Sequence, residues 1–126
     1  MAFAAFLAGC LGADEEPQPA SGAPRAIAEV VQRLERATAD RDFAVVCRDL
    51  FTAAARERAG GRDCVRLTRS ATAGVERPSL DLVAIDLEGA RARVRVRTRA
   101  TGQAPLSDVL LLRRERGEWR VEALGG

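Results

Sequence analysis

The chain of 126 residues contains no lysine, histidine, tyrosine or asparagine, and it has a single tryptophan. Without histidine it lacks the commonest general base and the commonest metal ligand. Without tyrosine it also lacks a phenol that could stabilise an oxyanion. All twenty basic residues are arginines, and the net charge of +2 is too small to indicate nucleic-acid binding. We therefore expect no metal, no cofactor and no nucleic-acid partner.

The first apolar segment, residues 2–9, is too short to span a bilayer, which takes about 20 residues. It leads into Leu7-Ala8-Gly9-Cys10, which resembles a lipobox, the signal for acylating a bacterial lipoprotein on its cysteine. The resemblance implies a lipid anchor on Cys10 at the extracytoplasmic face of the cell membrane. A signal peptide also begins with basic residues, whereas the first basic residue here is Arg25, so we expect a start upstream of Met1. The alternative is an ordinary N-terminus with a chance cysteine.

Residues 11–24 combine three acidic residues with three prolines, a composition that cannot bury enough apolar surface to become ordered. We predict a flexible tether that holds the domain on the order of 20 Å from its anchor. Residues 25–126 then form a single domain, because about 100 residues suffice for one core and not for two.

Three cysteines leave Cys47 and Cys64 as a pair once Cys10 is assigned to the anchor. In an exported protein this count predicts a disulfide bond. Two buried free thiols are the alternative. A metal site is disfavoured by the spacing, which is not that of a CxxC motif.

Apolar residues recur at helical spacing through the first half of the domain. We predict one helix from Pro24 to about Ala39, and a second with Phe43, Cys47 and Leu50 on its apolar face. Asp40 or Asp42 would cap the second helix. Two glycines at positions 60–61 would end the helical segment that precedes them. A short third helix capped by Asp63 would follow.

After Pro78 the period changes to two, which indicates strands. We expect a first strand over residues 80–87 with an irregularity near Val83-Ala84. The run from Ala90 to Arg99 alternates small or apolar residues with arginine, so that strand has one buried face. Two more strands follow around residues 105–113 and 119–123. Helices before an antiparallel meander predict an α+β fold, with the N-terminal helices packed on a curved sheet.

The order of these pieces resembles the nuclear-transport-factor-2-like superfamily, in particular its small exported actinobacterial members. The resemblance covers residues 25–124, and its most specific part is the closing hairpin Arg116-Gly117-Glu118-Trp119-Arg120-Val121. It implies a cone, formed by a bent sheet on helices, often with a pocket between them. Because the superfamily includes isomerases, dehydratases, cyclases and proteins that only bind or assemble, the fold alone does not give an activity.

The cone implied by the resemblance would place five candidate residues around a pocket: Phe43, Leu50, Asp108, Leu111 and Trp119. Asp108 is the carboxylate that could serve as a base. Because the chain lacks a tyrosine or histidine to assist it, we expect a non-catalytic binding or assembly module of the cell envelope. A small-molecule enzyme or carrier that uses the pocket is the alternative.

The arginine strand is a second candidate site, comprising Arg91, Arg93, Arg95, Arg97 and Arg99. These side chains could bind an anionic polymer or anionic lipid headgroups. The simpler interpretation is a solvated face, with cross-strand ion pairs to carboxylates at Asp81, Asp86, Glu88, Glu118 and Glu122. A homodimer surface is a third interpretation, which suits the enrichment of arginine at interfaces.

Overall fold

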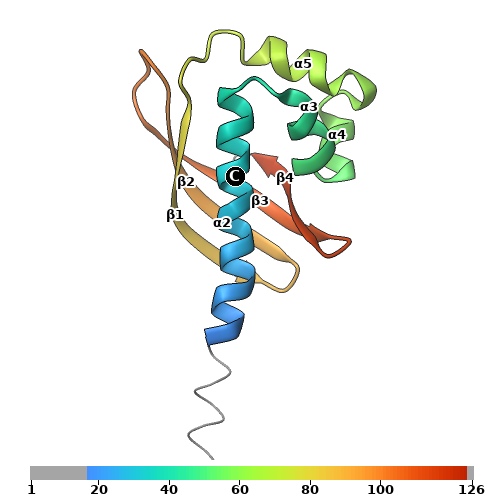
Figure 1. The fold of residues 1–126 in the computed structure, drawn as a ribbon, viewed down its shortest axis with the longest axis vertical. Helices are drawn as coiled ribbons and strands as arrows, with labels where there is room; N and C mark the ends of the chain where they lie inside the picture. Colours follow the sequence, from blue (N-terminus) through green and yellow to red (C-terminus); the bar gives the residue numbers. More distant parts are fainter. Residues whose placement is uncertain (1–16, 125–126) are drawn as a thin grey trace, which may run out of the picture.

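A computed structural model describes residues 17–124 and shows helices followed by an open, four-stranded antiparallel sheet (Figure 1). The strands are joined in sequence order, and their bounds are β1 Ser79–Glu88, β2 Arg91–Arg99, β3 Leu106–Glu115 and β4 Glu118–Leu124. The predicted α+β class and the meander are therefore confirmed. The candidate lipidation site Cys10 lies outside the described residues.

Helix α2, Pro17–Ala39, lies along one face of the sheet (Figure 1). Its predicted apolar stripe, Ile27, Val30, Val31 and Leu34, is buried. The predicted start at Pro24 was wrong, because the helix begins at Pro17 and includes residues 17–24 of the segment assigned to the tether. Proline is well suited to a first turn, and among residues 22–124, whose burial the structure describes, Ala23 is the first that packs against the core. The apolar pattern thus marked where packing begins.

None of the described helices is long and apolar enough to cross a membrane.

The segment between α2 and the sheet is a layer of short helices. Several short pieces replace the predicted second helix, whereas the predicted short third helix is present as α5. Asp42 begins it by accepting a hydrogen bond from the Val45 N–H, at 3.3 Å. Thr52 caps a further helix through the Ala55 N–H, at 3.0 Å. Asp63 does not cap its helix as predicted but forms an ion pair with Arg66. The elements are α3 Phe43–Val45, the π-helical turn η1 Val46–Leu50, α4 Ala53–Arg58, the 3₁₀ turn η2 Gly61–Asp63 and α5 Cys64–Ala71.

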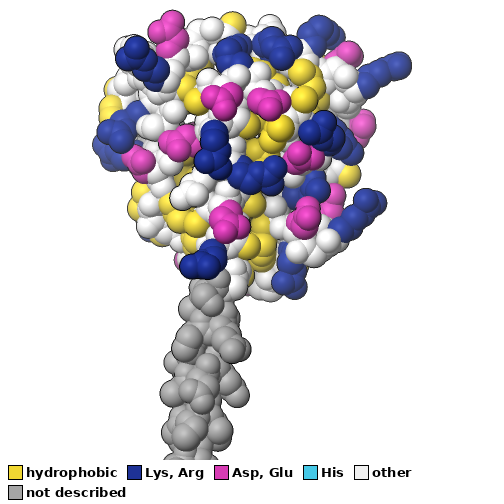
Figure 2. Space-filling model, viewed as in Figure 1, with side chains coloured by type: hydrophobic (Ala, Val, Ile, Leu, Met, Phe, Trp, Pro, Cys, Tyr) yellow, Lys and Arg dark blue, Asp and Glu magenta, His cyan; other side chains and the backbone are white. Residues whose placement is uncertain are grey.

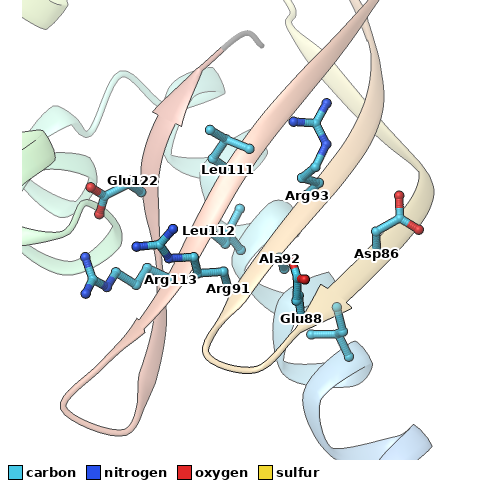
Figure 3. A pocket seen from close by; sticks show the side chains of 10 residues that line it. Asp86, Glu88, Arg91, Ala92, Arg93, Leu111, Leu112, Arg113 and Glu122 are labelled. Carbon is cyan, nitrogen blue, oxygen red and sulfur yellow. The ribbon is translucent and has the colours of Figure 1, made fainter.

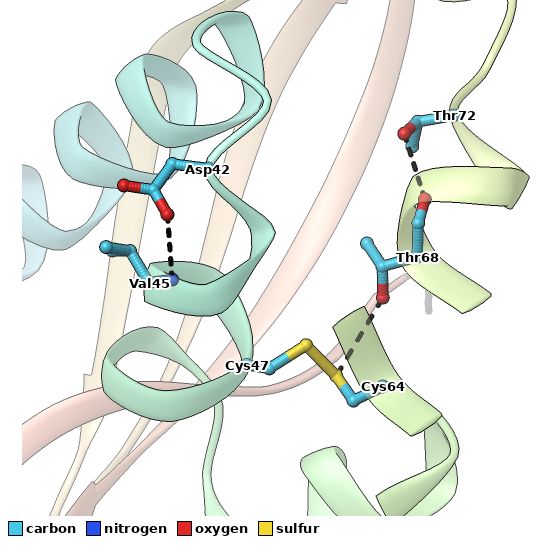
Figure 4. Close-up of a disulfide and its surroundings, with 6 residues drawn as sticks. All are labelled: Asp42, Val45, Cys47, Cys64, Thr68 and Thr72. Atoms are coloured by element: carbon cyan, nitrogen blue, oxygen red, sulfur yellow. Dashed lines mark hydrogen bonds between the residues drawn. A yellow bond between two sulfur atoms is a disulfide. The ribbon is translucent and has the colours of Figure 1, made fainter. Parts of the chain in front are cut away.

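A disulfide bond joins Cys47 of η1 to Cys64 of α5 (Figure 4). The Cα atoms are 6.1 Å apart, and both residues are buried. The Cys64 sulfur also lies 3.8 Å from the Thr68 hydroxyl one turn later in α5. The predicted pairing is confirmed, and it connects two helical pieces that are too short to be stable alone.

Strand β2 has the two faces that its alternation predicts. Ala92, Val94 and Val96 are buried beneath α2, whereas the arginines between them are exposed. We call the face covered by α2 the inner face and the opposite one the outer face. The irregularity predicted in β1 is present, because the register shifts between Leu82 and Ala84 and leaves Val83 unpaired. A second shift, which the sequence did not indicate, lies between β3 and β4 and leaves Glu122 unpaired.

The two edge strands contact helical elements in different ways. Beside β4, Phe51 forms a parallel bridge with Val121, and the Thr52 N–H donates to the Val121 carbonyl at 3.0 Å. On β1, the Leu80 N–H donates to the Glu35 carboxylate of α2 at 2.8 Å. These bonds pair backbone groups that an edge would otherwise leave free.

Replacing both disulfide cysteines, Cys47→Ala with Cys64→Ala, should lower the free energy of unfolding. The two cysteines are 17 residues apart in the sequence, and losing the constraint of such a loop on the unfolded chain costs about 3 kcal/mol. Urea denaturation followed by circular dichroism would measure the loss. Cys10→Ala is the control and should leave the unfolding midpoint unchanged. An unfolding free energy equal to that of the parent would show that the bond contributes nothing to stability.

Candidate functional site

A pocket of about 310 Å³ opens between the inner face of the sheet and the helices, and we call it the inner pocket. Its walls come from the second half of α2, from α3 and α5, and from the inner face of β1, β2 and β3. Gln103 and Ala104 of the loop between β2 and β3 complete its rim. Segments far apart in the sequence therefore meet around one hollow.

Most of the polar groups that line the inner pocket already have partners within the protein. The hydroxyl of Thr38 donates to the Leu34 carbonyl at 2.7 Å, and that of Thr72 donates to the Thr68 carbonyl at 2.9 Å. Glu35 accepts the Leu80 N–H described above. The two hydroxyls have used their only donor hydrogen and can only accept a bond from a ligand. Binding here would therefore depend mainly on apolar contact.

The carboxylate of Asp108 differs from these groups. It lies on β3 opposite Val96, at the inner face, and it lines the pocket although the residue is exposed. Within residues 17–124 it has no hydrogen-bond or ion-pair partner. Asp108 is therefore a carboxylate at the mouth that a ligand could reach.

The five predicted pocket residues do not all meet. Phe43 and Asp108 line the inner pocket. Leu50 is almost fully buried in the core, and Trp119 is also buried there, with the Arg114 guanidinium 5.9 Å from its ring centre. Leu111 lies on the outer face, opposite Arg93. Sequence reasoning missed the lining residues Thr68, Thr72 and Gln103, because isolated polar residues carry no periodic signal.

Phe43 fixes one wall of the inner pocket, with two guanidinium groups over its ring. The carbon centres of Arg41 and Arg69 lie 5.2 and 5.8 Å from the ring centre. Arg41 also donates to the carbonyls of Arg69 and Thr72, near the C-terminal end of α5. A cation at that end is favoured by the helix dipole. Arg41 thus holds α5 against α3.

The disulfide acts on the same walls. Cys47 directly follows Val46, which lines the pocket, and Cys64 precedes the lining residue Thr68 by one turn. Figure 4 shows the bond between the two helical segments, with Thr68 and Thr72 on the α5 side. The bond therefore fixes the distance between two walls of the inner pocket.

Charge on the helical side of the protein is mixed. Figure 2 shows arginine and acidic side chains interspersed there, with hydrophobic surface between them. On η1, a hydrogen bond from Arg48 to Asp49, at 3.1 Å, lowers the pKa of that carboxyl group. The pair stabilises the folded chain above the ordinary pKa of aspartate, and this small surface contribution is lost as the pH falls through the lowered value. Neither residue lines the inner pocket.

The outer face is dominated by arginine. All five predicted arginines of β2 are exposed on it. Arg99 pairs with Asp81 at 2.9 Å, whereas the other four have no carboxylate within 4.0 Å in the described part of the chain. The predicted cross-strand network is therefore reduced to one pair. Glu118 pairs with Arg120, and Glu122 lies 3.9 Å from Arg58.

Comparison with protein-family models and with curated proteins found no match to this chain. Within residues 17–124, no cluster of three or more histidine, cysteine or acidic side chains could hold a metal ion.

Replacing Arg41 should destabilise the protein, because it removes both the contact with Phe43 and the bonds to α5. We expect Arg41→Ala to lower the free energy of unfolding by roughly 1–2 kcal/mol, the sum of an exposed cation–π contact and a helix-end charge. Arg77→Ala is a matched control, because Arg77 is another arginine with positive φ and has no hydrogen bond or ion pair within the described residues. Equal losses in the two variants, measured by urea denaturation, would rule out the bracing role.

Proposed function

We propose that this chain is a non-catalytic ligand-binding module of a cell-envelope lipoprotein, and that the inner pocket takes a small, mainly apolar molecule. The observation that carries the proposal is the pocket itself, about 310 Å³ in volume, with an apolar lining. Leu106 and Leu124 at its rim are 61% and 68% exposed. Exposed leucines beside an apolar hollow favour a ligand that covers them.

We also propose that the sheet and helices form a cone like that of the nuclear-transport-factor-2-like superfamily. It is supported by the order of elements, helices before an antiparallel meander, and by a pocket between the two layers. The closing hairpin with Trp119 buried against the core agrees with the sequence resemblance.

Binding is favoured over catalysis by the chemistry of the lining. General acid–base catalysis needs a positioned acid or base beside the reacting group, usually with a partner that stabilises the developing charge. Asp108 is the one carboxylate at the mouth without a bonded partner among the described residues, and the hydroxyls of Thr38 and Thr72, which line the same pocket, donate to backbone carbonyls. The Asp108 carboxylate would instead orient a polar end of the ligand. A small-molecule enzyme stays the alternative.

The envelope location is supported by two independent features. The sequence Leu7-Ala8-Gly9-Cys10 has the pattern of a lipobox. The bond between Cys47 and Cys64 is of the kind that persists in oxidising compartments. A lipid on Cys10 would hold the domain at the membrane surface.

An apolar fluorescent probe tests the pocket. The purified protein should bind 1-N-phenylnaphthylamine saturably, and Leu106→Arg should weaken that binding at least five-fold because it places a charge at the rim. Val83→Arg is the control, since Val83 is 58% exposed on β1 and does not line the pocket. Fluorescence titration with both variants would decide. Absence of binding, or equal weakening by both substitutions, contradicts the proposal.

The anchor is tested by intact mass. Expressed in a bacterial host behind a signal peptide that ends at Gly9, the chain should gain diacylglycerol on Cys10 and fractionate with membranes. Cys10→Ser should abolish both the added mass and the membrane fraction. An unmodified Cys10 in the parent would refute the lipoprotein assignment and leave the pocket prediction standing.

A further inference from the structure

A second hollow, of about 570 Å³, lies on the outer face of the sheet, on the side away from α2 (Figure 3). We call it the outer hollow. Three arginines line it, Arg91 and Arg93 of β2 and Arg113 of β3, together with Leu111. Because it is separate from the inner pocket, a ligand bound there is independent of the proposed function.

The arginines of the outer hollow are unusually placed. Arg91 stands directly opposite Arg113 across the β2–β3 pair, and Arg93 follows two residues later on the same face. Like charges directly opposite one another destabilise a sheet. None of the three has a carboxylate within 4.0 Å in the described part of the chain. The fold therefore pairs two arginines across neighbouring strands, with no carboxylate of the described residues within ion-pair distance of either.

Acidic side chains also line the hollow, but they lie on either side of these arginines. Glu88 and Asp86 belong to β1 and stand opposite Arg91 and Arg93 in register, beyond ion-pair distance. Glu122 on β4 is the neighbour of Arg58. Figure 3 shows Asp86 on the far side of β2 from Arg113. Carboxylates in these positions repel an anion from the margins and confine it over β3.

We propose that the outer hollow binds a phosphate-type anion between the guanidinium groups of Arg91 and Arg113. A guanidinium presents a planar fork of N–H donors that fits two oxygens of a phosphate group, and such bonds are stronger than those between neutral groups. Two forks on paired strands can share the oxygens of one phosphate group, and its negative charge offsets the Arg91–Arg113 repulsion. The anion is either free, as inorganic phosphate, or the headgroup of an anionic phospholipid.

Titration with inorganic phosphate tests the site in the disulfide-bonded protein. The Nε resonances of the arginines, followed by NMR, should shift saturably. Arg91→Gln with Arg113→Gln should weaken binding at least ten-fold. Arg95→Gln with Arg97→Gln removes the same charge from the same face outside the hollow, and it should change affinity less than three-fold. Glu88→Gln should strengthen binding, because it removes a repelling charge.

Vesicles distinguish the two sources of the anion. Co-sedimentation with phosphatidylglycerol vesicles that weakens in the Arg91/Arg113 variant, and not in the Arg95/Arg97 variant, assigns the site to lipid headgroups. Phosphatidylcholine vesicles are the control. Saturable phosphate binding without vesicle binding assigns it to a free anion.

Three outcomes would overturn the proposal. The first is no saturable response to either probe. The second is equal weakening by the two double variants, which would indicate diffuse attraction to a basic face. The third is a change in sedimentation coefficient in the Arg91/Arg113 variant with phosphate binding unchanged, which would make this face a contact between two copies. Circular dichroism and thermal unfolding establish that both variants fold.

Discussion

The one-sided pattern of β2 is the constraint on which the rest of the structure depends. Its arginines cannot be buried without partners, because an isolated charge in an apolar interior costs several kcal/mol or more. A slip of one residue would turn the whole row toward α2. The strand therefore offers a single face, with Val94 and Val96, to the helix. The orientation of β2 determines which face of β1 and of β3 is the inner face. It therefore places the apolar inner pocket on one side of the sheet and the arginine-lined outer hollow on the other.

The helical layer is organised by cross-links more than by its own stability. Pieces of three to eight residues form neither a long helix nor a large apolar surface. They are held by the disulfide, by Arg41 over the ring of Phe43, and by the bridge from Phe51 to β4. These links leave the layer resting on one end of the sheet without filling the space beneath it, and that unfilled space is the inner pocket.

The buried face of an element could be predicted where the apolar pattern allowed one orientation, and could not where the pattern allowed two. The alternation in β2 and the stripe on α2 each allow one orientation, and both were predicted. In β3 three consecutive leucines allow either face, so Leu111 was assigned to the pocket although it faces outward. The unpaired Glu122 shifts the end of β4 in a way that no local pattern reveals. Asp108 was identified because a carboxylate before an apolar strand stands out, whereas the threonines of α5 depended on tertiary packing.

The unpaired Val83 in β1 disfavours the pairing of this edge strand with a second copy of the protein. An edge strand that continued straight would present a regular row of N–H and C=O groups, on which another chain could add as a further strand. The extra residue interrupts that row midway along β1, and Asp81 and Asp86 place negative charge on either side of the interruption. On β4, Thr52 already occupies part of the corresponding row. The sheet can thus stay open in shape while both of its borders resist growth into aggregates.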